Sequence, residues 1–306
     1  MNFSHSCPLC NASKQFQKFR TNKIFGKIGN KKRAFYQCLN CNIFYLFPRL
    51  NKKEEKTFYE KDFEKFMGDR SKRKNDWRDI EKHIISNKEN KLRRFKYLKN
   101  LIKGKKNILE YGCSSGFMLF PLIQKNYNCY GIEPSGKFYD YLISKNLKIY
   151  KNENEFKKKN KNQKLDVIMH FFVMEHIFNL KEFINNQMNL LNKKGIIVAE
   201  IPNADDPLNT IYKPKAFENF YWSIAHPWYF NQNSLKYFLD SLGYKYKIIK
   251  DQRYDLSNHM YWQIYGKPGG QFKFSEIFGK QLDKKYINRL IQTGYCDTLI
   301  AIIYKN

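Results

Sequence analysis

Four of the seven cysteines occur as two closely spaced pairs near the start of the chain. Cys7 and Cys10 form one Cys-x-x-Cys pair, and Cys38 and Cys41 form the second after 27 intervening residues. Each such turn presents two thiolates to one ion, and two turns complete the tetrahedral sulfur site typical of structural zinc. Four thiolates leave no open coordination position, which argues against a catalytic metal here. We therefore predict a structural zinc ion, with two unrelated thiol pairs as the alternative.

A second group of chemically capable residues surrounds a glycine turn. The apolar segment 106–110 ends in the carboxylate of Glu110, and Gly112 and Gly116 follow it. The next segment, 117–123, is apolar and is expected to be helical. Glycines at a strand-to-helix turn let the backbone approach a ligand closely. The pattern therefore predicts a ligand-binding turn at the end of a strand.

A second acid follows at the spacing that a nucleotide-binding βαβ unit requires. Segment 127–132 reads as the next strand and ends at Glu133, 23 positions after Glu110. In such units an acid at the end of the second strand accepts hydrogen bonds from the ribose hydroxyls. The glycine turn and the two acids, Glu110 and Glu133, each lie at the end of a predicted strand. Together they indicate a nucleoside-containing cofactor.

The arrangement Glu110-x-Gly112-x-x-x-Gly116 resembles motif I of class I S-adenosylmethionine-dependent methyltransferases. The resemblance implies that Glu110 lies near the methionine amino group, that Gly112 lies against the cofactor and that Glu133 holds the ribose diol. The family often has a further glycine where this chain has Ser114. The cofactor-binding residues implied by the resemblance are Glu110, Gly112, Cys113, Ser114, Gly116, Glu133, Pro134 and Phe171.

The resemblance covers about residues 80–306. Segments 164–176, 190–203, 244–249 and 297–304 look like the family's fourth, fifth, sixth and closing antiparallel strands. This implies an α/β fold with a Rossmann-like seven-stranded methyltransferase sheet, preceded by a small N-terminal zinc ribbon. With the cysteine pairs in front, the chain resembles bacterial methyltransferases that modify sugars in surface polysaccharides or glycosylated metabolites.

Two histidines are the predicted catalytic pair. Methyl transfer to a hydroxyl requires an oriented acceptor and usually a base, for which histidine is well suited. His176 follows the fourth strand, and His226 follows the fifth at the same carboxyl edge. We predict these two as base and orienting partner, although either could instead be a hydrogen-bonded structural residue. Related sugar C-methyltransferases carry a Glu-His pair where this chain has Ala225-His226, and they have a further C-terminal domain after the closing strand. Because this chain has neither feature, we expect O- or N-methylation.

The remaining elements must position these groups. Tyr59, Phe63 and Phe66 follow a helical spacing, which indicates core packing or a lid over the site. We expect a zinc ribbon at 1–50, a helical connector and possible lid at 51–105, and an S-adenosylmethionine-dependent methyltransferase domain at 106–306 with a substrate insert at about 204–275.

The formal net charge of the chain is +28. Such a balance favours anionic partners, but the lysines are scattered, so general compositional drift is the preferred interpretation. No apolar run of about 18 residues predicts a membrane span, and the N-terminus lacks the apolar core of a signal peptide. Paired cysteines without an export signal indicate a reducing compartment, and we expect a cytoplasmic protein.

Three functions remain open at this stage. The leading hypothesis is methylation of a hydroxyl or amino group of a sugar, nucleotide-sugar or related small molecule. An RNA methyltransferase would fit the positive charge, but the fifth strand ends in Ile-Pro-Asn203 without the motif of base amino methylation. The third hypothesis is a non-catalytic zinc-ribbon binding protein, against which the acids and glycines of the cofactor turn argue.

Overall fold

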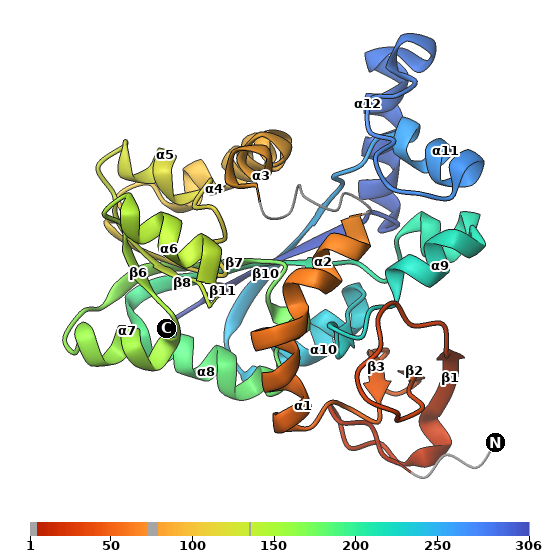
Figure 1. Cartoon of the computed structure of the whole chain (residues 1–306), viewed down its shortest axis with the longest axis horizontal. Helices are drawn as coiled ribbons and strands as arrows, with labels where there is room; N and C mark the ends of the chain where they lie inside the picture. Colours follow the sequence, from red (N-terminus) through yellow and green to blue (C-terminus); the bar gives the residue numbers. More distant parts are fainter. Residues whose placement is uncertain (1–4, 72–78, 135, 306) are drawn as a thin grey trace.

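The fold is organised around a mixed seven-stranded sheet. A computed structural model describes residues 5–71, 79–134 and 136–305, and its large sheet has the order β10-β11-β8-β7-β4-β5-β6 (Figure 1). The strands β4 to β8 run parallel, whereas β11 pairs antiparallel with both β8 and β10. The strand bounds are β4 Asn107–Tyr111, β5 Asn128–Ile132, β6 Lys148–Tyr150, β7 Leu165–Phe171, β8 Leu191–Pro202, β10 Lys245–Asp251 and β11 Thr298–Tyr304. The predicted Rossmann-like methyltransferase sheet is confirmed.

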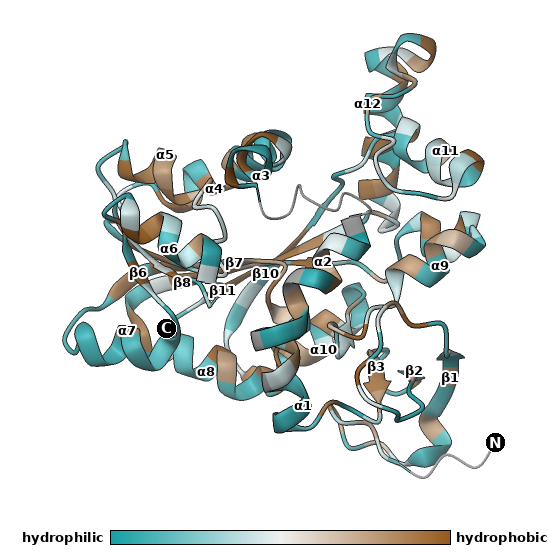
Figure 2. Cartoon of the chain, viewed as in Figure 1, coloured by the Kyte–Doolittle hydropathy of each residue, from teal (hydrophilic) through white to brown (hydrophobic). Residues whose placement is uncertain are grey.

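Helices cover both faces of this sheet. On one face lie α4 (Lys88–Leu101), α5 (Leu119–Ile123) and α6 (Gly136–Ser144); on the other lie α7 (Glu153–Lys159), α8 (Leu180–Leu190) and α10 (Gln232–Leu242) (Figure 1). Two cores result, one on each face. The central strands are almost continuously apolar because both of their faces are buried, and Figure 2 shows the polar residues on the outer sides of the helices.

The N-terminal residues form a second sheet with the order β1-β2-β3-β9. The strands β2 (Ala34–Cys38) and β3 (Phe44–Phe47) form the hairpin predicted around the second cysteine pair, and β1 (Gln17–Thr21) extends it after the short helix η1 (Lys14–Phe16). The fourth strand, β9 (Trp228–Tyr229), comes from the predicted substrate insert. The ribbon therefore shares its sheet with the insert.

Between the ribbon and the large sheet, the part of the chain that the structure describes (51–71 and 79–105) is mainly helical. It forms α1 (Lys52–Thr57), a π-helical turn η2 (Phe58–Asp62) and α2 (Phe63–Ser71), followed by α3 (Ile80–Ser86) and α4. A capping box at Asn51 starts α1, because its side chain accepts from the Glu54 amide while the Glu54 carboxylate accepts from the Asn51 amide.

Further helices lie beside the carboxyl edge of the parallel strands. The short helix η3 (Met174–His176) follows β7. The insert adds η4 (Leu208–Tyr212), α9 (Lys215–Tyr221) and α11 (Leu256–Tyr265), and α12 (Ser275–Thr293) comes after it. Helices α11 and α12 project as an arm (Figure 1). Among the described residues, no helix is both long enough and apolar enough to cross a membrane.

Candidate active site and metal centre

The four predicted zinc ligands converge at one point of the ribbon. Their sulfur atoms all lie within 4.8 Å of one another, with Cys7 Sγ 3.7 Å from Cys41 Sγ and Cys10 Sγ 3.6 Å from Cys38 Sγ. A tetrahedral zinc with bonds of about 2.3 Å places its sulfurs about 3.8 Å apart. The donor set and its spacing therefore fit a zinc ion.

The glycine turn lies at the carboxyl end of β4, where the strand order reverses direction. Gly112 has φ +65°, and a Cβ there would come within 2.9 Å of Val173 Cγ2. Gly116 has φ +72°, and its Cβ would come within 2.6 Å of Leu142 Cδ2. Ser114 also has a positive φ of +48°, a conformation that glycine adopts more readily than other residues. Ligands of open α/β sheets bind in this crevice.

Glu133 at the end of β5 is oriented toward the turn. The backbone amide of Ser114 donates to Glu133 Oε2 at 2.6 Å, which fixes the carboxylate at the rim of the cavity. This placement suits a carboxylate that also accepts hydrogen bonds from a ribose diol.

Glu110 at the end of β4 is buried, and its Oε2 has no hydrogen-bond partner within the part of the chain that the structure describes. Burial raises the pKa of Glu110 well above its usual range, while Arg94 opposes the rise. Burial of a carboxylate oxygen without a partner costs free energy unless a cation or a hydrogen-bond donor binds to that oxygen. An amino-acid ammonium group satisfies that requirement, so the turn and its two acids fit S-adenosylmethionine.

A cavity of about 1880 Å³ opens beside this turn. Its volume exceeds that of a typical single-ligand pocket, which leaves room for a cofactor and an acceptor side by side. Six of the eight predicted cofactor residues line it: Glu110, Gly112, Ser114, Glu133, Pro134 and Phe171. The side chain of Cys113 points into the apolar core instead, and Gly116 lies behind the turn, where the next helix packs against it.

The predicted catalytic histidines come together from distant parts of the chain. The rings of His176, from η3, and His226, just before β9, meet edge to face with centroids 4.5 Å apart, and both line the cavity. Tyr59 Oη lies 3.1 Å from His176 Nδ1 and links the pair to the helix above it. Burial lowers the pKa of His176 to about 4 and that of His226 well below 6.5. Both rings are therefore neutral at pH 7 and can accept a proton.

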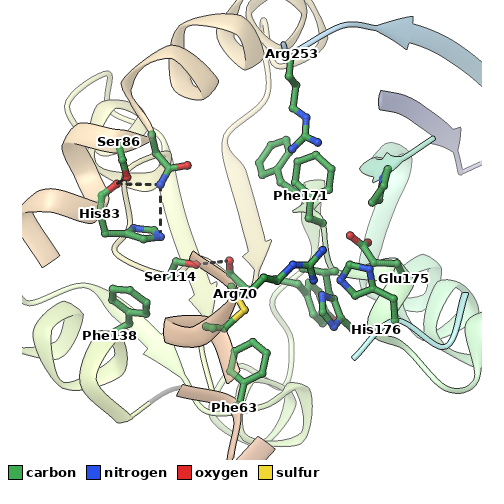
Figure 3. Close-up of a pocket in the computed structure, with 18 of the residues that line it drawn as sticks. Phe63, Arg70, His83, Ser86, Ser114, Phe138, Phe171, Glu175, His176 and Arg253 are labelled. Carbon is green, nitrogen blue, oxygen red and sulfur yellow. Dashed lines mark hydrogen bonds between the residues drawn. The ribbon is translucent and has the colours of Figure 1, made fainter. Parts of the chain in front are cut away.

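Glu175, which directly precedes His176, completes this cluster. Both of its carboxylate oxygens are buried without a hydrogen-bond partner among the described residues, and burial raises its pKa to about 8. Arg70, from α2, points toward Glu175 and His176 (Figure 3). Nothing in the sequence around Arg70 signalled this position, because only the packing of α2 over the sheet edge brings it there.

The other histidines lie elsewhere. His5 stacks on Phe47 beside the cysteine cluster, and His170 is enclosed in the sheet. His259 Nδ1 is 2.6 Å from Tyr286 Oη at the base of the projecting arm. His83 Nδ1 lies 2.9 Å from Ser115 Oγ and lines the cofactor end of the cavity.

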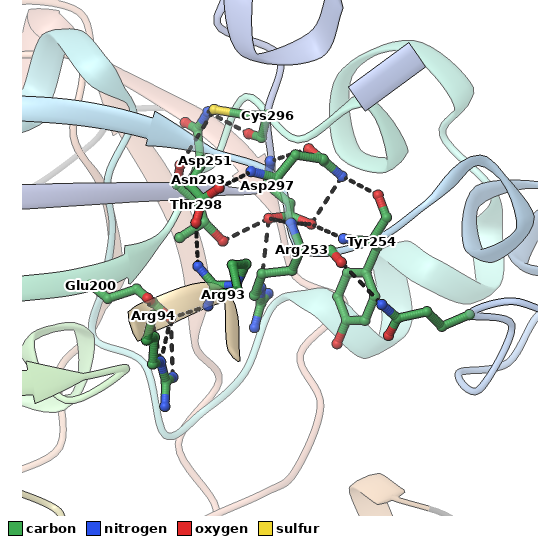
Figure 4. A network of polar contacts seen from close by, with 12 residues as sticks. Arg93, Arg94, Glu200, Asn203, Asp251, Arg253, Tyr254, Cys296, Asp297 and Thr298 are labelled. Atoms are coloured by element: carbon green, nitrogen blue, oxygen red, sulfur yellow. Dashed lines mark hydrogen bonds and ion pairs between the residues drawn. The ribbon is translucent and has the colours of Figure 1, made fainter. Parts of the chain in front are cut away.

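A buried network of ion pairs and hydrogen bonds lies next to the cavity (Figure 4). Glu200 on β8 is fully buried between Arg93 and Arg94, with N–O distances of 2.7 and 3.0 Å. Asp297, at the start of β11, accepts from the backbone amides of Arg253 and Tyr254 and forms an ion pair with the Arg253 side chain at 3.6 Å. These contacts fix the arginines that line the cavity to the carboxyl edge of the sheet.

Fold and cavity together define a class I S-adenosylmethionine-dependent methyltransferase. The sequence profile of a methyltransferase domain family matches residues 78–247, more than half of the chain, and the chain belongs to this family. The third hypothesis, a non-catalytic protein, is thereby set aside. A comparison with functionally curated proteins finds no match.

Solved methyltransferases share the architecture. The plantazolicin methyltransferase BamL is 12% identical, with 83% of this chain and 94% of that chain covered and a TM-score of 0.51. The plantazolicin methyltransferase BpumL is 15% identical, with 82% and 93% covered and a TM-score of 0.50. A S-adenosylmethionine-dependent methyltransferase from Archaeoglobus fulgidus is 18% identical, with 69% and 91% covered and a TM-score of 0.47. At these identities the likeness concerns the fold alone.

Proposed function

We propose that this methyltransferase modifies a hydroxyl or amino group of a sugar, nucleotide-sugar or related small molecule in glycan biosynthesis. The observation that carries the proposal is the acceptor end of the cavity. There the pair His176 and His226 faces a compartment with aromatic walls, to which Phe217, Phe220 and Trp262 contribute. Aromatic faces beside a few polar groups suit a compact, ring-shaped acceptor better than an extended polymer.

We assign the cofactor end of the cavity to the residues of the turn and its neighbours. Glu110 binds the amino group of the cofactor, Glu133 binds the ribose diol, and Gly112 provides the close backbone approach. Ser114, Pro134 and Phe171 line the remaining wall, while Cys113 and Gly116 hold the shape of the turn. The cofactor supplies the methyl group on a sulfonium that is already a good leaving group.

In the acceptor half, His226 is the proposed base and His176 its orienting partner. His176 is anchored through Tyr59, whereas His226 Nδ1 has no hydrogen-bond partner among the described residues. A neutral His226 takes the proton of the acceptor hydroxyl as the oxygen attacks the methyl carbon in line. His176 keeps that ring in place at van der Waals distance.

The ribbon has a structural role in this proposal. Cys7, Cys10, Cys38 and Cys41 bind zinc, and the ribbon supports the insert through the β3–β9 pairing. We keep the division into a ribbon at 1–50, a helical connector at 51–105 and a methyltransferase domain at 106–306, with the cytoplasm as the expected compartment for reduced thiolates.

Labelled S-adenosylmethionine tests the acceptor class. The enzyme is incubated separately with neutral and acidic sugars, with nucleotide-sugars and with total RNA, and label in each fraction is counted. Label in a saccharide or nucleotide-sugar supports the proposal. Label in RNA alone would instead support the second hypothesis, an RNA methyltransferase.

Replacing Glu133 by Gln tests the cofactor assignment. Loss of the charged acceptor of two hydroxyl hydrogen bonds should weaken S-adenosylhomocysteine binding by at least about tenfold in calorimetry, since a charge-assisted hydrogen bond contributes about 1.5–3 kcal/mol. The exposed acid Glu276, changed to Gln, serves as the control. Unchanged affinity in the Glu133 variant would remove this residue from the site.

A further inference from the structure

Three arginines line the cavity, and one of them differs from the others. Arg94 forms an ion pair with Glu200 at 3.0 Å, and Arg253 forms one with Asp297 at 3.6 Å. Arg70 forms no ion pair within residues 5–71, 79–134 and 136–305; its guanidinium instead lies over the Phe220 ring, 4.8 Å from the centroid. Burial lowers the pKa of Arg70, although not enough to discharge a guanidinium. A desolvated cation of this kind is costly without an anionic partner.

The groups around Arg70 are mostly donors. Its charge acts on His176 and His226, and both rings can present an N–H to the cavity. Tyr59 brings a hydroxyl to the same corner. Glu175, the acid whose charge acts on Arg70, makes no ion pair with it among the described residues, and burial raises the pKa of Glu175 to about 8. Burial also raises the pKa values of Glu55 and Asp206, two further acids of the cavity wall.

A metal ion is the competing occupant of this corner. Glu175, His176 and His226 each offer a ligand atom, and these atoms lie within 4.8 Å of one another. A divalent cation there would, however, face the like charge of Arg70, which points toward Glu175 and His176 (Figure 3) and whose charge also acts on His226. In a partly desolvated cavity that repulsion is substantial, because the low dielectric strengthens it. The same charge attracts an anion.

We propose that Arg70 binds an oxyanion, a carboxylate or phosphate group, that the methyl acceptor carries close to the atom that becomes methylated. The planar guanidinium suits such a group because it donates two parallel hydrogen bonds. The hydrogen-bonded pair of Tyr59 and His176 adds one more donor, because one of its two protons is used between the two side chains. The aromatic wall at Phe220 orients the guanidinium. The inference rests on the proposed function and narrows it, since the acceptor becomes an acidic or phosphorylated sugar.

Binding of matched sugars tests this inference without any turnover. The enzyme is first saturated with S-adenosylhomocysteine, so that anions cannot occupy the cofactor half. D-glucuronate, D-glucose 6-phosphate and neutral D-glucose are then titrated separately by calorimetry. At least one of the two anions should bind about tenfold or more tightly than glucose, and their order distinguishes carboxylate from phosphate.

Variants of Arg70 locate the effect. Arg70→Met should abolish the preference for the anion, and Arg70→Lys should retain part of it, because charge remains without the fork. The control is Lys53→Met, which removes an exposed charge on α1 outside the cavity lining and should leave the preference intact. Without ligand, the thermal midpoint of Arg70→Met should be no lower than that of the parent protein. Addition of the anion should raise the thermal midpoint of the parent protein but not that of Arg70→Met.

Three results would overturn the inference. Equal binding of glucose and both anions is the first, and an unchanged anion preference in Arg70→Met is the second. The third is Co²⁺ absorption of nitrogen–oxygen type in enzyme whose cysteine site already holds zinc, lost in Glu175→Gln, because it would assign a cation to this corner. None of these results bears on methyl transfer itself, which the labelled-cofactor experiment measures independently.

Discussion

At the scale of single residues, backbone conformation governs the cofactor turn. Gly112 and Ser114 both have positive φ, but only Gly112 also lacks space for a side chain, since Val173 stands 2.9 Å from the position of a Cβ. We therefore expect a substitution at Gly112 to disturb the turn and the replacement of Ser114 by glycine to be tolerated.

We predict that Gly112→Ala lowers S-adenosylhomocysteine affinity at least about tenfold and reduces stability by about 1–3 kcal/mol, through strain and the collision with Val173. Ser114→Gly should bind the cofactor product as the parent does, because glycine adopts φ +48° without strain. Calorimetry and urea unfolding measure both effects. If the alanine variant bound normally, the turn would not lie against the cofactor.

His226 gives a residue-scale prediction about pH. His226→Ala should lower kcat by about 10²–10⁴-fold and leave cofactor affinity unchanged, because it removes only the proton acceptor. In the parent, burial depresses the pKa of His226 below 6.5, so the base is already unprotonated at neutral pH. The acid limb of kcat/KM should lie below pH 6.5, with activity falling as the base becomes protonated. An acid limb centred above pH 7 would point to another base.

At the scale of elements, the carboxyl edge of β8 is tied to α4 through one buried carboxylate. Burial alone would raise the pKa of Glu200, but Arg94 and Arg93 outweigh it and lower the pKa to about 2. Because the folded-state pKa lies below the unfolded value of about 4.5, the stabilisation is present above that pH and disappears as the pH falls toward 2. Helix α4 and the strand edge therefore act as one unit under the cavity.

Replacing Glu200 by Gln tests that unit. Two buried guanidinium groups would lose their shared anion, and we expect a loss of about 3–5 kcal/mol in the free energy of unfolding. Glu276→Gln, on the exposed side of α12, should change it by less than about 0.5 kcal/mol. Similar small changes in both variants would mean that the network contributes specificity rather than stability.

At the scale of the whole molecule, the ribbon that carries the four cysteines packs against the insert. The strand β3 pairs with β9, the Phe25 amide donates to the Trp222 carbonyl at 2.7 Å, and the Phe35 and Trp222 rings lie 5.0 Å apart. Both Trp222 and Trp228 are buried at this junction. The cofactor turn takes no part in these contacts, since it lies at the carboxyl end of β4.

Removing the metal should therefore affect the two halves of the site unequally. Chelation should lower the thermal midpoint and shift tryptophan emission to longer wavelength, while S-adenosylhomocysteine affinity stays within about twofold. Re-addition of zinc should restore the emission. If cofactor affinity collapsed together with the ribbon, the halves would be coupled more tightly than these contacts indicate.

The chain's own sequence determined the parts of the site that are local. The cofactor turn and its two acids lie in short contiguous segments, and each cysteine pair is a single turn, so residue types and spacing were sufficient to predict them. The later strands of the sheet were predicted from the resemblance to methyltransferases. The pairing of His176 with His226 was predicted from a shared strand edge, and the structure brings them to one point. The short strand β9 carries no periodic pattern, because two residues are too few to show one.

Only the tertiary structure determined which residues from distant segments contact these local motifs. Arg70 and Tyr59 reach the histidines from helices more than 100 residues away in the chain, and the ribbon completes its sheet with a strand of the insert. Such contacts depend on how apolar faces are buried against one another, which is a property of the packed molecule and not of any segment. The sequence by itself thus determined the fold class and the methyl donor. Packing placed Arg70, which has no ion-pair partner among the described residues, beside the proposed catalytic pair, and this placement defines the acceptor that we propose.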